Sequence, residues 1–338
     1  MEKKRYDSID TFKIIGAFLV VCLHTLMEEP LNGYVKTIAR IGVPYFFLVS
    51  GFFAYRAPED WTKELRLKKM KNVFKHVWIM FGVDLVYAFS GIFLYEHTLR
   101  ETVMSLFHFS FVTANFHVAG HLWFMRALIC LEIGELAFYD ILHSKKLKYI
   151  LLAVWALDLF LFKYSFLFGF TLQGAGVECL SKYIGTGFLY YFIGWLIRQE
   201  ETKISEWIEG KEKWILLMTV FCCGMNLLEY HILESYQKNL MPINYFFTFF
   251  LINGIFVLLI RYREWGKGSF VHFLGGKASM YIYYWHVLIR NILSVYAKEH
   301  GIPKINLLNP IVIFLASIGL SLAILGLKNL IFRKKIRG

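Results

Sequence analysis

Charge, proline and paired cysteine are all scarce in this 338-residue sequence. Charged residues make up 18% of it and there are only 6 Pro, against about 25% charged residues in a typical soluble domain. The 5 Cys are odd in number and form no C-x-x-C pair, so we expect neither a disulfide framework nor a zinc or other metal site. The motifs of P-loop ATPases, hydrolase elbows and zinc proteases are also absent, which leaves those three enzyme classes without support.

Apolar residues dominate what is present. Hydrophobic residues account for 57% of the chain and aromatic residues for 18%, with a mean hydropathy of +0.49. The net charge of +12 is compatible with nucleic acid, anionic substrates or anionic lipid. In so hydrophobic a chain it indicates a protein of the lipid bilayer, and no nucleic-acid partner is expected.

Long apolar runs follow one another along the whole sequence. A helix that spans a bilayer needs about 20 mainly apolar residues, and this criterion predicts an all-α polytopic membrane protein with about ten transmembrane helices in a single integral-membrane domain over residues 1–338. The predicted spans are roughly 11–27, 35–55, 73–95, 120–142, 149–168, 183–197, 214–232, 243–260, 273–296 and 309–327.

The distribution of Lys and Arg predicts the orientation of these spans. The segments that would share the side of the N-terminus hold 24 Lys and Arg residues, and the opposite loops hold 5. Because basic residues concentrate in cytoplasmic loops, both termini are expected in the cytoplasm and the protein in the cytoplasmic membrane. No internal repeat is visible, so nothing indicates an inverted-repeat transporter.

The first predicted helix carries a cation and an imidazole on one face. Lys13 and His24 are eleven residues apart, which is about three turns and about 16 Å of helix. Asp10 is an i,i+3 neighbour of Lys13 and is expected to pair with it. Ionisable groups inside spans are candidate functional residues, but Lys13 could equally reach the lipid headgroups and His24 could be a packing residue.

Two later spans carry further candidates for a shared cavity. His121 and Trp123 begin the fourth span, and Arg126 follows within a turn. A structural ion pair of Arg126 with Glu132 and Glu135 is favoured over catalysis. His286 ends an aromatic run in the ninth span, where packing and catalysis remain equally open. The single acids within spans are expected to be satisfied interhelical contacts; they are Asp84, Asp158 and Glu229.

A basic cluster precedes the third span, at Lys68, Lys69 and Lys71. Its simplest explanation is the orientation signal, supported by headgroup attraction of about 1 kcal/mol per cation. A functional explanation is a clamp for phosphate groups, because Lys supplies a compact positive charge to them.

Taken together, four sequence segments resemble the integral-membrane acyltransferase family 3. They are IDTFKIIGAFLVVCLH at 9–24, RIGVPYFFLVSGFF at 40–53, HLWF at 121–124 and SMYIYYWH at 279–286. The first has the family's basic residue followed by His eleven residues later, and the second has its G-V-P-x-F-F-x-x-S-G-F stretch. The order of the segments also resembles that of the family, and the similarity extends from about residue 6 to residue 327. The chain is similar, too, to the membrane domain of serine/alanine racemases of the vancomycin-resistance type.

The resemblance implies a specific reaction. Family members move an acyl group, often acetyl, from cytoplasmic acyl-CoA to a hydroxyl or amino group of an extracytoplasmic acceptor, typically a cell-envelope glycan. It implies that His24 is the essential histidine, that Lys13 is its basic partner, and that Lys68, Lys69 and Lys71 contact the donor where the family has R-x-x-R. The possible cavity residues are then Asp10, His121, Trp123, Arg126 and His286.

Two other functional classes stay open from the sequence. One is a membrane transporter or binding module for a small molecule such as an amino acid, without covalent chemistry. The other is a non-catalytic partner of cell-envelope assembly. The acyl chain, the acceptor and the oligomeric state are not determined by the sequence.

Overall fold

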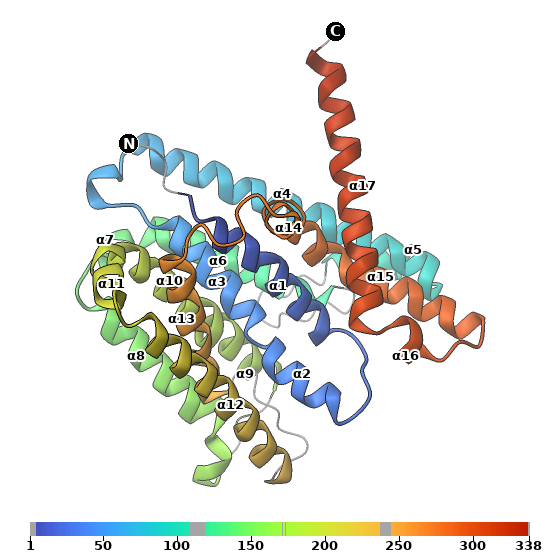
Figure 1. Ribbon diagram of the computed structural model, residues 1–338. Helices are drawn as coiled ribbons and strands as arrows, with labels where there is room; N and C mark the ends of the chain where they lie inside the picture. Colours follow the sequence, from blue (N-terminus) through green and yellow to red (C-terminus); the bar gives the residue numbers. More distant parts are fainter. Residues whose placement is uncertain (1–4, 108–118, 171, 173, 237–244, 337–338) are drawn as a thin grey trace. The chain divides into compact units, whose positions relative to one another are not determined.

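The computed structural model describes residues 5–107, 119–170, 172, 174–236 and 245–336 (Figure 1). Every regular element in these ranges is helical, which confirms the all-α prediction. The first two residues of the predicted span 243–260 lie outside these ranges. So do four of the basic residues counted for the orientation, namely Lys3, Lys4, Lys238 and Arg337. The chain divides into two compact units, which we call unit 1 (Met1–Gly42 and Ile255–Gly338) and unit 2 (Val43–Gly254).

Unit 1 is assembled around the first helix of the chain. Helix α1 packs against α14, α15, α17 and α2, and α15 runs beside α17 (Figure 1). The end of α13 also reaches unit 1, where the Ser8 hydroxyl donates to the Leu259 carbonyl (2.5 Å). The bounds are α1 Asp7–Leu23, α2 Leu31–Ala39, α13 Phe246–Arg261, α14 Phe270–Lys277, α15 Ser279–Glu299, α16 Lys304–Leu307 and α17 Pro310–Ile336.

A glycine allows α14 to approach α1 at backbone distance. A Cβ atom on Gly275 would lie 1.7 Å from the carbonyl oxygen of Asp10, so only glycine fits there. Further along α1, the rings of Phe18 and Phe314 meet edge to face at 5.0 Å. The same helix that carries the predicted functional residues is therefore fixed by close contacts near both of its ends.

The longest helix described in unit 2 is α4, followed by α12. Helix α4 packs on α6, and the irregular helical segment η5 contacts α6, α8 and α10. The bounds are α3 Gly42–Ala54, η1 Pro58–Asp60, α4 Lys63–Tyr95, α5 Leu99–Phe107, η2 Gly120–Leu122, α6 Trp123–Ala137, α7 Tyr139–Leu142, α8 Leu147–Asp158, η3 Leu159–Lys163, η4 Ser165–Phe168, α9 Ala175–Leu180, η5 Ser181–Phe188, α10 Leu189–Gln199, α11 Glu201–Ile208 and α12 Glu212–Tyr236.

Helices α3 and α10 cross through a reciprocal pair of glycines. A Cβ atom on Gly51 would lie 1.7 Å from the Tyr191 carbonyl oxygen, and one on Gly194 would lie 2.0 Å from the Leu48 carbonyl oxygen. Small residues of this kind let the backbones of membrane helices touch. The glycine of the S-G-F motif therefore has a packing role in this chain.

We predict that Gly51→Ala destabilises the protein. The added methyl group would meet backbone atoms, which cannot rotate away, and overpacking of this kind typically costs about 1–3 kcal/mol. Gly224→Ala is the matched control, because a Cβ atom at Gly224 meets nothing within 4 Å and alanine favours the helix. Thermal unfolding in one detergent should show a lower Tm for Gly51→Ala only. Equal Tm values would contradict the close crossing.

Within the described residues, four helical stretches are long and apolar enough to cross a membrane. They are Leu31–Ala54, Lys63–Tyr95, Glu212–Ser235 and Pro310–Ile331, and the helix Phe246–Arg261 is apolar but shorter. These four correspond to the second, third, seventh and tenth predicted spans. The number of about ten crossings and the cytoplasmic side of both termini stay predictions.

Several predicted spans are interrupted in the structure. The ninth, 273–296, is divided between α14 and α15 around Ala278, where α14 turns after its close contact with α1. The fifth, 149–168, is regular only to Asp158 and then continues through π-helical and 3₁₀ turns. Asp158 is buried there, forms an ion pair with Lys163 and accepts a hydrogen bond from the Ser181 hydroxyl at 2.9 Å. Local rewinding of this kind is often associated with such interior polar contacts.

Candidate active site

The two candidates near the start of α1, Lys13 and Asp10, form the local ion pair that their spacing predicts. The ammonium nitrogen Nζ of Lys13 lies 2.7 Å from Asp10 Oδ1, and both side chains are partly exposed. Two further residues join this group: His272 Nε2 on α14 lies 3.2 Å from Asp7 Oδ1 and 3.9 Å from Asp10 Oδ2. Lys13 therefore stands beside a carboxylate at the surface of unit 1.

His24 lies at the opposite end of α1, where the helix stops. It is the C-cap residue, with φ −108° and ψ 6°, and its backbone N–H donates to the Val21 carbonyl. The side chain is half-buried. An imidazole just past the last helical turn is held by a rigid element and can still be approached by a substrate.

Helix α15 brings a second imidazole to His24. The ring centroids of His24 and His286 are 5.2 Å apart, and His286 is fully buried. His286 Nδ1 lies 3.0 Å from the Ile282 carbonyl and 2.9 Å from the Tyr283 carbonyl. Carbonyls only accept hydrogen bonds, so Nδ1 carries a proton, and in a neutral ring Nε2 is then the acceptor. Of the possible cavity residues, His286 is thus placed with His24.

Arg290, a residue without a predicted role, completes this group. It follows His286 by one turn of α15, and its Nη1 donates to the His24 carbonyl at 3.4 Å. Its Nε and Nη2 donate to Asn291 Oδ1 at 3.2 and 2.8 Å. In the sequence, its spacing of four residues from His286 is the feature that indicates a place on the same face of the helix. The guanidinium holds the end of α1 against α15 and adds positive charge beside the two imidazoles.

Of the remaining possible cavity residues, Asp10 lies with Lys13 in unit 1, and His121, Trp123 and Arg126 belong to unit 2. His121 Nε2 lies 3.3 Å from the Tyr87 hydroxyl, and the indole of Trp123 lies beneath the ammonium of Lys182 at 5.8 Å. Arg126 is 1% exposed and its Nη2 donates to Asp84 Oδ1 at 3.3 Å. The structure thus gathers His121 and Arg126 against one face of α4.

The predicted ion pair of Arg126 with Glu132 and Glu135 is wrong in its partners. Arg126 pairs with Asp84 of α4, whereas Glu132 lies 2.8 Å from His76 Nδ1 and Glu135 pairs with Lys69. Both acids of α6 therefore pair with side chains of α4. Together with the pair of Arg126 and Asp84, three side-chain pairs connect the two helices. Asp84 is a satisfied interhelical contact, as the sequence predicts.

The three lysines predicted to contact the donor differ in their surroundings. Lys68 and Lys71 are exposed on the first turns of α4. Lys69 has only 15% of its side chain exposed; besides its ion pair with Glu135, it donates to the Ala54 carbonyl at 2.9 Å and its ammonium lies 5.2 Å above the Trp61 ring. Glu135 in turn accepts from the Tyr191 hydroxyl at 3.0 Å. Lys69 therefore has a structural partner that its two neighbours do not share.

The described ranges contain no ligand set for a metal ion. No group of three or more His, Cys, Asp or Glu side chains stands close enough there to hold a metal ion. The groups that the structure offers are imidazoles, ammonium groups and carboxylates. Imidazoles and carboxylates can take up and release protons, and ammonium groups can bind anions.

Comparison with known proteins places this all-helical membrane protein in a family. Residues 6–327 match the acyltransferase family 3, described as an Acyltransferase domain. The chain belongs to that family. No solved structure matches it.

Curated relatives include racemases of enterococci. A serine/alanine racemase of Enterococcus gallinarum is 24% identical over 354 residues, covering 97% of this chain and 47% of the relative. An amino-acid racemase of Enterococcus faecalis is 24% identical over 143 residues, covering 37% of this chain and 19% of the relative. The chain spans about half, or less, of the length of these relatives, so their names describe larger proteins.

Proposed function

We propose that this protein transfers an acyl group, in the first place acetyl, from cytoplasmic acyl-CoA to a hydroxyl or amino group of an extracytoplasmic acceptor such as a cell-envelope glycan. One observation carries the proposal: in a chain of the acyltransferase family, the half-buried His24 at the end of α1 lies 5.2 Å, ring to ring, from His286. A positioned imidazole is the group that this reaction needs most.

In the proposed mechanism His24 is the general base. An acceptor hydroxyl has too high a pKa to attack a thioester unaided, and a neutral imidazole can take its proton as the attack proceeds. The acceptor oxygen forms a bond to the acyl carbon, the carbon–sulfur bond breaks, and the thiolate of CoA receives the proton. His286 and Arg290 position His24 in this scheme, the first from the side and the second through the His24 carbonyl.

The donor is proposed to bind through its phosphates. The nucleotide end of acyl-CoA is polyanionic and needs cations at the cytoplasmic surface. Lys68 and Lys71, both on α4 of unit 2, supply exposed ammonium groups for this contact. Lys13 of unit 1 is proposed as the basic partner of His24. The ion pair of Lys69 with Glu135 favours a supporting role for Lys69 rather than direct contact with the donor.

The test of this function is thermal stabilisation of the purified protein in lipid nanodiscs. A ligand that binds only the folded state raises stability by RT ln(1 + [L]/Kd), about 2.7 kcal/mol at a hundredfold excess over Kd. We expect acetyl-CoA to raise Tm, free L-serine and L-alanine to leave it unchanged, and labelled acetyl-CoA to acetylate an envelope glycan fraction. No response to acetyl-CoA and no transfer would reject the acyltransferase function.

A second candidate function rests on the racemase relatives. Because 97% of the chain aligns with part of a serine/alanine racemase, a membrane module that binds or transports a small molecule such as an amino acid is the alternative. In the same assay this alternative predicts the reverse response, namely stabilisation by L-serine or L-alanine and none by acetyl-CoA.

A further inference from the structure

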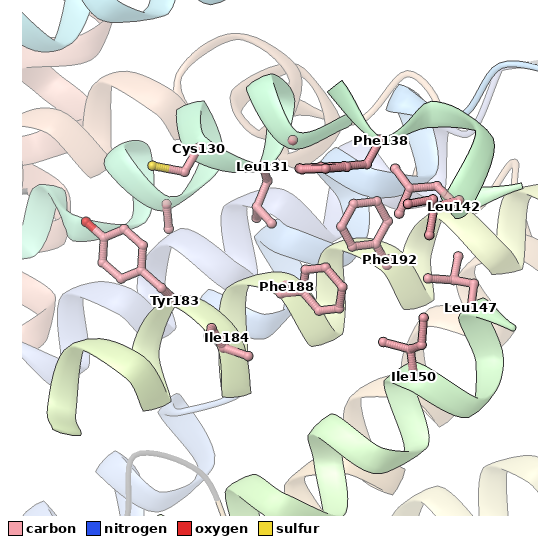
Figure 2. Close-up of a pocket in the computed structure, with 13 residues that line it drawn as sticks. Cys130, Leu131, Phe138, Leu142, Leu147, Ile150, Tyr183, Ile184, Phe188 and Phe192 are labelled. Carbon is pink, nitrogen blue, oxygen red and sulfur yellow. The ribbon is translucent and has the colours of Figure 1, made fainter. Parts of the chain in front are cut away.

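Unit 2 contains an apolar pocket that is separate from every residue placed in the proposed mechanism. It has a volume of about 360 Å³ and lies between α6, the α7–α8 region and the η5–α10 helix. Figure 2 shows Tyr183 and Cys130 near one end of the pocket and Leu142, Leu147 and Ile150 near the other. Its walls are otherwise hydrocarbon and carry no charged side chain.

The rim of this pocket is exposed and apolar. Phe138, Ile141, Ile150 and Ile184 line it and are all at least 37% exposed. Exposed apolar side chains around a pocket are unfavourable in water, but they are the normal lipid-facing surface of a membrane protein. The pocket is therefore entered from hydrocarbon, which fits a lipid chain better than a ligand arriving from solution.

Exposed positive charge lies beside the end of the pocket that Leu142 and Leu147 line, whereas Lys182 and Arg126, near the Tyr183 end, are paired with Glu178 and Asp84. Leu142 and Leu147 line that end, and the four residues between them include Lys145 and Lys146, which are both exposed. Neither lysine forms an ion pair within the described ranges. The first turn of the twelve-residue helix α8 begins at the same point and adds the positive end of a helix dipole.

Together these features match an amphiphile with an anionic head and a hydrocarbon chain. We infer that the pocket binds an anionic phospholipid, with one acyl chain along α6 and η5 and the phosphate at Lys145 and Lys146. Basic residues close to a membrane surface attract anionic headgroups by about 1 kcal/mol each. A phospholipid bound here supports the packing of α6 against η5 and α10, and the inference holds whatever acceptor the enzyme uses.

Gly134 provides a way to fill the pocket. It lines the pocket, and a Cβ atom there would meet nothing within 4 Å. Gly134→Phe can therefore place a ring in the space proposed for the acyl chain of the lipid. Gly224→Phe is the matched control, since Gly224 also has open space around it and does not line this pocket. For the headgroup, the test pair is Lys145→Gln with Lys146→Gln, and the control pair is Lys211→Gln with Lys213→Gln, which changes two exposed lysines elsewhere.

The experiment is native mass spectrometry of the full chain with added phosphatidylglycerol or phosphatidylcholine of identical chains. We expect the unsubstituted protein to retain phosphatidylglycerol on the order of tenfold better, the Lys145/Lys146 double variant to lose this preference, and Gly134→Phe to retain less of both lipids. Both control proteins should behave like the unsubstituted chain. Since the two lysines are exposed, their double variant keeps the test valid even if Gly134→Phe does not fold.

Two results would overturn the inference. One is equal retention of the two lipids by the unsubstituted protein. The other is displacement of phosphatidylglycerol by palmitoyl-CoA but not by CoA, blocked in Gly134→Phe, which would make the pocket the binding site of the donor's acyl chain. Because acetyl-CoA is the probe for the proposed function, failure of either proposal leaves the other standing.

Discussion

Replacing His24 by alanine is expected to lower acyl transfer by about 10²–10⁴-fold, the range typical of a lost general base. The side chain lies at the end of α1 and is only half-buried, so its removal leaves the packing of α1 on α14 and α15 in place. Membrane insertion, Tm and stabilisation by acetyl-CoA should therefore change little. The measurement is the initial rate of labelled acetyl transfer at saturating acetyl-CoA.

The matched control is His300→Ala. His300 also caps a helix in unit 1, at the end of α15, and is exposed, with its ring stacked on Tyr296 at 4.0 Å. It has no place in the proposed reaction, so this variant should keep full activity. Undiminished transfer in His24→Ala would reject the base assignment, and an equal loss in both variants would show that the effect comes from handling or stability.

The local part of this site follows from the sequence, and the rest does not. An i,i+3 spacing brings Asp10 to Lys13 in any helix, and the structure confirms that pair. His24 and His286 are separated by 262 positions, and no periodicity within one helix relates them. Their contact depends on how α1 packs against α15, which is a tertiary contact that no local pattern in the sequence encodes.

Helical periodicity by itself argues against the predicted pairing of Arg126 with Glu132 and Glu135. Six and nine residues beyond Arg126 are about 240° and 180° further round a helix of 3.6 residues per turn. The two acids therefore face away from Arg126, and its partner has to come from another helix. That partner, Asp84, lies 42 positions earlier, and the sequence presents it only as one of several isolated acids.

The limits of the spans were the least predictable part of the fold. Hydropathy detects an apolar run, but it does not report where a helix turns or rewinds inside that run. The ninth span divides at Ala278, three residues after the tight contact of Gly275 with α1, and the π-helical turns after Asp158 accompany a buried ion pair with Lys163. Both features are consequences of tertiary packing.

Breaking the ion pair of Lys69 with Glu135 is expected to lower the stability of the protein strongly. Only 2% of the Glu135 side chain and 15% of the Lys69 side chain are exposed. Removing one member of a buried pair leaves an uncompensated charge and typically costs about 3–5 kcal/mol. Lys69→Met should therefore lower Tm strongly, whereas Lys68→Met, which removes an exposed cation on the same helix turn, should not.

A double substitution then distinguishes a structural role of Lys69 from a role in donor binding. Glu135→Gln removes the stranded charge and keeps an amide oxygen that can accept from the Tyr191 hydroxyl, so Lys69→Met with Glu135→Gln should regain most of the lost stability. If Lys69 only supports the fold, the double variant also binds acetyl-CoA as tightly as the unsubstituted protein, while Lys68→Met and Lys71→Met bind it more weakly. Regained stability with weakened acetyl-CoA binding would instead place Lys69 among the donor contacts, and a double variant as unstable as Lys69→Met would contradict the ion pair itself.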